Sequence, residues 1–190
     1  CELTAIAEVR PSLRSKVKQR YGFTRSYATH QELLADKDLD AVVVVTPRHL
    51  TGPTVMDCLN SGKHVLSEKP MAGTSEQGLS LLAAADHAKV RYCVGYMKRY
   101  DAGVLRAREL LKQFIASGEL GQILQVRATC YMGDSYCHAA GHVITDEVAD
   151  ISVKGWAEAP DWIPLKEQPL FARYANVYSH VTNLLNFLFL

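Results

Sequence analysis

The chain has 190 residues, 48% of them hydrophobic, and a formal net charge of +1 at pH 7. This length suits one large or two small domains, and the near-neutral charge without a basic, aromatic-interleaved stretch excludes a nucleic-acid-binding protein. No apolar run reaches the roughly 18 residues of a membrane span, and no secretion signal opens the chain. Five cysteines at irregular spacings favour reduced thiols. We therefore expect a cytoplasmic protein with no nucleic-acid or membrane partner.

Strands and helices alternate along the first 95 residues. Glycine and proline positions and two capping-box patterns predict helices at 12–21, 29–35, 53–60 and 74–89. Apolar segments predict strands at 2–8, 23–28, 42–45, 62–70 and 92–95. The valine run at 42–45 is typical of a strand buried on both faces. This alternation predicts crossover units of a doubly wound parallel sheet, an α/β fold.

The pattern changes after residue 96. A long helix is predicted at 102–117, closed by Gly118, and an alternating strand follows at 123–132. We expect residues 1–96 to form a dinucleotide-binding domain and residues 97–190 to begin a second, α+β domain. The sequence starts in a predicted strand and ends in the apolar run 184–190, which would be exposed unless further polypeptide covered it; we therefore expect an internal portion of a longer protein.

Four segments carry a family resemblance. They are Thr-Pro-Arg-His at 46–49, Gly-Lys-His-Val-Leu-Ser-Glu-Lys-Pro at 62–70, Val-Gly-Tyr at 94–96 and Gly-Glu-Leu-Gly at 118–121. In this order and spacing the chain resembles the glucose–fructose oxidoreductase/inositol dehydrogenase/MocA family, and the Glu-Lys-Pro corner is the specific element. The resemblance implies an NAD(P)-dependent oxidoreductase for sugars, cyclitols or related polyols. It also implies a Rossmann domain followed by a domain with an open, mainly antiparallel sheet, through which relatives pair as homo-oligomers (dimers or tetramers).

The resemblance further implies that the first Rossmann strand and its glycine loop are missing from this sequence. Such proteins place an acidic residue roughly 20 residues after the loop, at the end of the second strand, and Glu8 matches that position. In the strand order 3-2-1-4-5-6 the first strand is central. We therefore expect a gap between the strands present, and no sound cofactor site in this chain by itself.

The candidate cofactor-binding residues lie at predicted strand ends. The resemblance implies that Glu8 accepts hydrogen bonds from the adenosine ribose, which favours NAD; Arg10 is placed to pair with a 2′-phosphate, so NADP stays open. Thr46 and Pro47 are expected to line the crevice near the phosphates and ribose. We interpret His49 as a packing or cofactor-edge residue rather than a catalyst.

Glu68, Lys69 and Pro70 form the central group of candidates. The resemblance implies that Glu68 lies near the nicotinamide ribose and that Lys69 reaches the substrate oxygen. An ammonium there can donate a hydrogen bond to developing alkoxide charge, and burial beside a positive ring would lower its pKa. Pro70 fixes the corner, and a cis Lys69–Pro70 bond is compatible with proline alone. The alternative is a surface salt bridge between Glu68 and Lys69.

His180 is the second catalytic candidate. Helical spacing puts Asn176, His180 and Asn183 on one face. The family pattern is an aspartate four residues before a histidine, so His180 matches as the acid/base group and Asn176 departs from the pattern. An amide can orient an imidazole or a substrate, but it cannot neutralise an imidazolium. This departure favours two alternatives: a binding or structural role for His180, and a non-catalytic cofactor-binding regulator or assembly partner.

Two further groups of residues lie outside these candidates. Tyr96, Lys98 and Arg99 follow the last predicted strand of the first domain, where they suit either contact with nicotinamide or substrate, or packing between domains. The cysteines and histidines of the second domain match no zinc spacing, so we expect no metal. These residues are Cys130, Cys137, His138 and His142.

Overall fold

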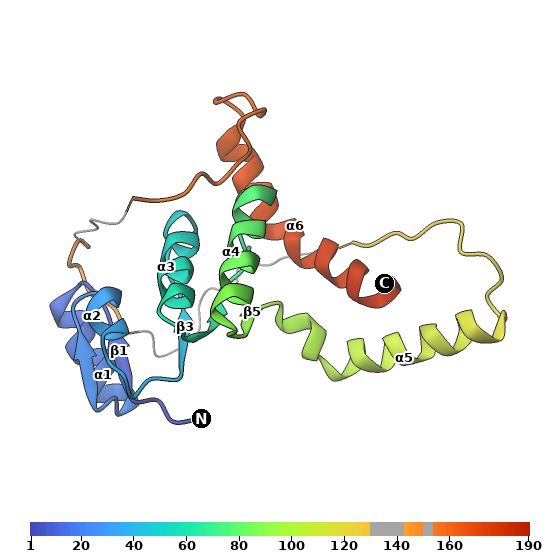
Figure 1. The fold of residues 1–190 in the computed structure, drawn as a ribbon. Helices are drawn as coiled ribbons and strands as arrows, with labels where there is room; N and C mark the ends of the chain where they lie inside the picture. Colours follow the sequence, from blue (N-terminus) through green and yellow to red (C-terminus); the bar gives the residue numbers. More distant parts are fainter. Residues whose placement is uncertain (130–142, 150–153) are drawn as a thin grey trace.

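A computed structural model of the chain describes residues 1–129, 143–149 and 154–190 (Figure 1). The elements in chain order are β1 (Ala5–Ala7), α1 (Pro11–Tyr21), β2 (Arg25–Tyr27), α2 (His30–Leu34), β3 (Ala41–Val44), α3 (Arg48–Asn60), β4 (His64–Ser67), α4 (Ser75–Ala88), β5 (Tyr92–Val94), a 3-10 helix η1 (Met97–Tyr100), α5 (Ala102–Ser117) and α6 (Gln168–Phe189). The alternation predicted for the first 95 residues is confirmed.

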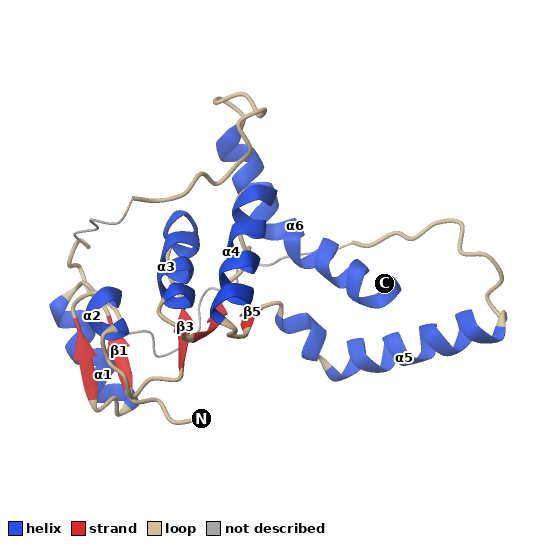
Figure 2. Cartoon of the chain, viewed as in Figure 1, coloured by secondary structure: helices blue, strands red, loops and turns tan. Residues whose placement is uncertain are grey.

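The strands form two separate parallel sheets. One pairs β1 with β2, and the other has the order β3-β4-β5, with every strand pair parallel. Figure 2 shows the two sets of strands standing apart. Within the described part of the chain β1 and β3 are not hydrogen-bonded to each other. The gap expected at the centre of the sheet is confirmed.

The hydrophobic core lies between the three-stranded sheet and the helices α3 and α4, which run side by side in Figure 1. Strand residues Val44 and Val65 pack there against helix residues, the largest fully buried ones being Leu59 and Leu81. Burying an aliphatic side chain of this size stabilises a fold by about 1.5–3 kcal/mol. The core therefore fixes β3 and β4, and with them the loops that follow.

The opposite face of this sheet is open, which corrects the prediction that the valine strand is buried on both faces. Val43 is 61% exposed and Leu66 is 43% exposed. A parallel strand is buried on both faces only when helices cover both. Among the described residues α3 and α4 cover one face only, so alternate side chains of β3 and β4 remain in solvent.

Both predicted capping boxes contribute hydrogen bonds, but only one is complete. At the start of α4 the Thr74 hydroxyl accepts from the Gln77 N–H (3.3 Å) and the Gln77 side chain accepts from the Thr74 N–H (3.3 Å). At the start of α2 Thr29 accepts from the Glu32 N–H, whereas the Glu32 carboxylate accepts from Ala28 instead of Thr29. Each cap satisfies N–H groups that a helix leaves unpaired.

Helix α3 begins at Arg48, five residues before the predicted start at Pro53. Proline lacks an N–H, so Pro53 leaves the carbonyl of His49 without its helical partner. The backbone N–H of Trp156 donates to that carbonyl at 2.7 Å. Trp156 also lies against Gly52, where an added Cβ would be 2.3 Å from the indole ring. The proline therefore creates a docking point for residues 154–158 on α3.

The second domain is described only in part. Helix α5 has the predicted bounds and ends at Gly118, whose φ is +75°. The predicted strand 123–132 is wrong over residues 123–129, which form no strand, because a strand needs a neighbouring backbone to pair with and none of the described strands lies beside it; residues 130–132 lie outside the described part. None of the described helices combines the length and hydropathy of a bilayer crossing. The boundary at residues 96 and 97 stays a prediction.

We expect Gly52→Ala to displace Trp156 from α3. The added methyl group would overlap the indole ring, and overpacking of this kind costs about 1–3 kcal/mol. In a Trp162→Phe background, which removes the other tryptophan, the Trp156 emission should move to longer wavelength and acrylamide quenching should increase. Gly78→Ala is the control, because its nearest atom would be the Met71 sulfur at 3.9 Å. Equal changes in both variants would contradict the docking point.

Candidate functional site

The candidate site lies at the carboxyl ends of the parallel strands, where helix α6 passes close to the loop after β4. Lys69 follows β4 through a cis Lys69–Pro70 bond, as predicted. Its ammonium donates to the side-chain oxygen of Asn176 (2.7 Å) and to the Asn176 carbonyl (3.1 Å). These bonds join residues 107 positions apart in the sequence and bring α6 against the end of β4.

The Glu68 carboxylate accepts from the backbone N–H of Lys69 (3.1 Å), while the Lys69 ammonium turns to Asn176. The lysine therefore pairs with a neutral amide rather than forming the surface salt bridge that was the alternative. Burial lowers the pKa of Lys69, and the positive charge of Arg48 lowers it further, against the opposing effect of Glu68. Desolvation disfavours the charged form of an amine, which explains the direction.

His180 lies one helical turn beyond Asn176 on α6, beside Tyr96, with the two rings edge to face at 6.1 Å between centroids. Its Nδ1 is buried and has no hydrogen-bond partner among the described residues. Burial lowers the pKa of His180, and the charges of Lys69 and Lys98 lower it further. The imidazole is therefore kept neutral to a lower pH than an exposed histidine, with one ring nitrogen available.

Arg99 makes packing contacts with α6. Its Nε donates to the Asn183 side-chain oxygen at 2.6 Å, and its guanidinium lies 5.2 Å from the centroid of the Phe187 ring. The guanidinium of Arg108 lies 4.2 Å from the centroid of the same ring. These contacts anchor η1 to the face of α6 that carries His180. Burial raises the pKa of Tyr96, and a hydrogen bond with Ser179 opposes that effect.

The end of β1 carries the predicted acidic position. Glu8 follows β1, and its carboxylate accepts from the Nε (2.7 Å), Nη2 (3.0 Å) and backbone N–H (3.0 Å) of Arg10. Arg14 donates to the Glu8 carbonyl at 2.8 Å. The Arg10 hydrogen bond is the main cause that lowers the pKa of Glu8. The carboxylate is therefore ionised and oriented, and it shares its position with a guanidinium.

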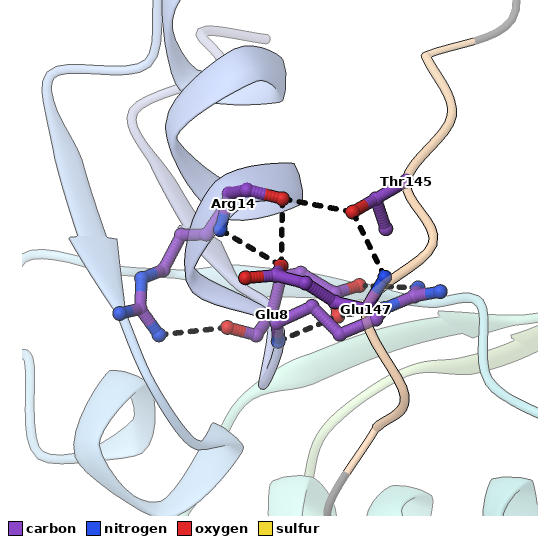
Figure 3. Close-up of polar contacts among 6 residues, drawn as sticks. Glu8, Arg14, Thr145 and Glu147 are labelled. Carbon is purple, nitrogen blue, oxygen red and sulfur yellow. Dashed lines mark hydrogen bonds and ion pairs between the residues drawn. The ribbon is translucent and has the colours of Figure 1, made fainter.

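Residues 143–149 lie against this end of β1, which the sequence alone did not indicate (Figure 3). The Glu147 carboxylate accepts from the backbone N–H (2.9 Å) and hydroxyl (2.7 Å) of Ser12 at the start of α1. The Thr145 hydroxyl lies 2.8 Å from that of Ser12. A carboxylate at a helix N-terminus is favoured by the free N–H groups and the helix dipole. No local signal links residues 135 positions apart.

The remaining predicted residues lie at the end of β3. Thr46 follows β3 and Pro47 caps α3, as the strand-end prediction requires. The Thr51 hydroxyl donates to the Thr46 carbonyl at 3.2 Å. An added Cβ at Gly155 would be 2.7 Å from the His49 ring, so His49 packs against the segment that carries Trp156.

A cavity of about 600 Å³ opens beside this cluster, between α6 and the segment 70–78, which comprises the loop after β4 and the first turn of α4. Its lining includes Pro70, Tyr96, Trp156 and Tyr178.

Cys130, Cys137, His138 and His142 lie outside the described residues. The residues that the structure brings together are therefore Lys69, Asn176, His180 and Tyr96 at one end, and Glu8 with Arg10 at the other.

Parallel strands joined by crossover helices, with acidic, threonine-proline and Glu-Lys-Pro strand ends, are typical of a dinucleotide-binding protein of the Rossmann class. Residues 1–96 match the model of the oxidoreductase family with an NAD-binding Rossmann fold. The chain belongs to this family, that of glucose–fructose oxidoreductase, inositol dehydrogenase and MocA, which confirms the resemblance.

Named relatives agree with the family. Levoglucosan dehydrogenase of Pseudarthrobacter phenanthrenivorans is 31% identical over 68% of this chain and 32% of its own length. Inositol 2-dehydrogenase/D-chiro-inositol 3-dehydrogenase of Shouchella clausii is 31% identical over 82% of this chain and 45% of its own. The WlbA dehydrogenase of Bordetella pertussis, solved with NADH and UDP-GlcNAcA, is 32% identical with a TM-score of 0.57, over 64% of this chain and 34% of that one. The chain thus spans less than half the length of these relatives.

The described residues fit the two ends of a nicotinamide dinucleotide. Glu8 and Arg10 offer an acceptor and a cation where an adenosine ribose would lie, and the buried unpartnered Nδ1 of His180 suits a hydroxyl at the nicotinamide end. Glu8 follows β1 of the two-stranded sheet, whereas His180 lies on α6, which is held at the end of β4 of the three-stranded sheet. The pyrophosphate between them would need donors beyond the residues named above.

We expect the His180 imidazole to titrate below its ordinary pKa of 6.5, and to titrate at a higher pH in Lys69→Met. Burial causes the first effect, and loss of the lysine charge causes the second. NMR titration of the imidazole C2 proton, assigned with His180→Gln, measures both. Lys37→Met is the control, because Lys37 lies before β3, at the opposite end of the sheet. A His180 midpoint that is the same in Lys69→Met and in wild type would show that the two groups do not face each other.

Proposed function

We propose that the protein is an NAD(P)-dependent dehydrogenase that acts on a CH–OH group of a sugar, cyclitol or related polyol. The observation that carries the proposal is the convergence of Lys69 and His180. The lysine is hydrogen-bonded to Asn176, one helical turn from the histidine, and both groups have lowered pKa values. Perturbed acid and base groups that meet at strand ends are typical of a catalytic site.

The two side chains divide the proton chemistry between them. When bound, the nicotinamide supplies the hydride acceptor or donor. The neutral His180 imidazole accepts the hydroxyl proton of the substrate, and its lowered pKa keeps it neutral at pH 7. The Lys69 ammonium donates a hydrogen bond to the same oxygen and stabilises the negative charge that develops there. Alcohol oxidation should therefore be lost as the pH falls through the lowered pKa of His180.

The substrate class and the cofactor rest on the relatives and on the end of β1. The named relatives act on levoglucosan and inositols, according to their names, and one solved relative holds NADH. The Glu8 carboxylate repels a 2′-phosphate, which favours NAD, whereas Arg10 attracts one. We therefore propose NAD as the preferred cofactor, with NADP as the second candidate.

Assembly and location remain part of the proposal. Exposed apolar side chains after α5, such as Leu124 at 86% exposure, support a further packing partner for this region. We propose a dimer or tetramer through the second-domain sheet, in the cytoplasm. Lys98 and Tyr96 follow β5 and remain candidates for contact with nicotinamide or substrate.

Lys69→Met and His180→Ala should each lower kcat for polyol oxidation in the full-length protein by about 10²–10⁴-fold, because each removes a group that binds or accepts the proton. The reduced cofactor is followed by its absorbance on a panel of polyols and sugars, and cofactor binding is followed by its fluorescence. Lys37→Met and His87→Ala are controls, since neither residue lies at the strand ends. Wild-type rates in both test variants would remove the proposed roles. Cofactor binding without turnover on the whole panel would support the non-catalytic regulator or assembly partner.

Glu8→Gln should shift cofactor preference towards NADP. Removing the carboxylate removes a repulsion and frees Arg10, which it now holds through three hydrogen bonds. We expect the ratio of Kd for NADP to Kd for NAD to fall about tenfold, which corresponds to ~1.4 kcal/mol. Glu2→Gln is the matched control, because Glu2 is exposed and precedes β1. An unchanged ratio would show that Glu8 does not face the ribose.

A further inference from the structure

The Lys69 ammonium is held by an uncharged residue. Both of the acceptors that it contacts among the described residues, the side-chain oxygen at 2.7 Å and the carbonyl at 3.1 Å, belong to Asn176. An amide oxygen orients an ammonium as well as a carboxylate does, but it does not neutralise it. Position 176 therefore separates two effects, orientation and charge compensation, that a carboxylate would combine.

We propose that Asn176 is a positioning residue that holds the Lys69 ammonium beside His180 through its amide oxygen and leaves the positive charge uncompensated. The proposal rests on the proposed function for the use of Lys69 in catalysis. It differs from the expectation that position 176 orients the imidazole or the substrate. In the structure the Asn176 side chain is committed to the lysine, and His180 Nδ1 remains without a described partner.

The charges around Lys69 are mostly positive. Glu68 lies next to it at the end of β4, Arg48 lies at the start of α3, and His180 projects from α6. Lys98 of η1 also acts on His180. Among the described charged groups that act on Lys69 and His180, Glu68 is thus the one carboxylate. Its side chain accepts a hydrogen bond from a backbone N–H.

An uncompensated ammonium is a stronger acid than a compensated one. The lowered pKa of Lys69, caused first by burial, agrees with this arrangement. A more acidic ammonium donates a stronger hydrogen bond to a developing alkoxide, but it loses its proton at a lower pH. The cost of the arrangement is therefore an earlier loss of activity on the alkaline side.

The test is the pH dependence of acetylation of Lys69 in the full chain. Acetic anhydride labels only the neutral amine, and mass spectrometry compares Lys69 with the exposed Lys37 in the same sample. In Asn176→Asp we expect the Lys69 midpoint to rise by about 1–3 pH units, the effect of an adjacent opposite charge. The alkaline limb of kcat should rise with it, while KM changes less than kcat.

Asn183→Asp is the matched control. It adds the same charge to the same face of α6, but at the residue whose oxygen accepts from Arg99. We expect it to leave the Lys69 midpoint nearly unchanged. A rise in Asn176→Asp no larger than in Asn183→Asp would overturn the proposal. If Asn176→Asp does not fold, Asn176→Ala carries the test: losing the 2.7 Å bond should raise the alkaline plateau of Lys69 labelling relative to Lys37, and an unchanged plateau would overturn the positioning role.

The labelling needs no turnover, so the two proposals fail separately. A protein without dehydrogenase activity whose Lys69 midpoint still moves in Asn176→Asp would refute the proposed function and leave the role of Asn176 standing. An active enzyme whose midpoint does not move would refute the role of Asn176 alone.

Discussion

The contact between Lys69 and Asn176 is the interaction on which the site depends. It ties the loop after β4 to α6, and about two turns further along the helix Asn183 ties Arg99 of η1 to the same face. His180 lies between these two anchors. Its position therefore follows from two amide side chains, spaced seven residues apart, that each accept from a cation outside α6. The helix period of 3.6 residues puts all three on one face, so the sequence spacing becomes the geometry of the site.

The second constraint is the gap in the sheet. Because β1 and β3 share no described ladder, side chains connect the two parts of the first domain. His30 of α2 lies 2.8 Å from Asp57 of α3, and Lys63, before β4, donates to the carbonyl of Asp36, after α2, at 3.2 Å. Contacts of this kind, between half-exposed groups, are weak beside strand pairing. The distance between Glu8 and Lys69, which a dinucleotide bound as proposed would span, is therefore set less firmly than the arrangement within either sheet.

Local signals predicted most of the first domain, and long-range packing decided what they missed. The Thr74 capping box and the glycine after α5 depend on neighbouring residues, and both are in place. The start of α3 depends on Trp156, whose N–H satisfies the carbonyl that Pro53 leaves free. The exposure of one face of β3 depends on which helices cover the sheet, and a run of valines does not predict that. At the candidate site, Lys69 follows a strand and His180 shares a helix face with Asn176, as the strand-end and helix spacing predicted, but no local pattern shows that Asn176 accepts from the lysine.

The protonation states of Lys69 and His180 also depend on each other. Each lies in the positive field of other side chains, and each is partly buried, so the charged form of either is disfavoured. A proton on His180 makes a proton on Lys69 less favourable, and the reverse also holds. Because an amine is intrinsically far more basic than an imidazole, Lys69 is protonated first as the pH falls. His180 is protonated only at a lower pH. A neutral base beside a charged donor is the state that the proposed alcohol oxidation would require, and mutual repulsion of the two charges favours that state. A carboxylate at position 176 would relieve that repulsion, so that His180 would take up its proton at a higher pH.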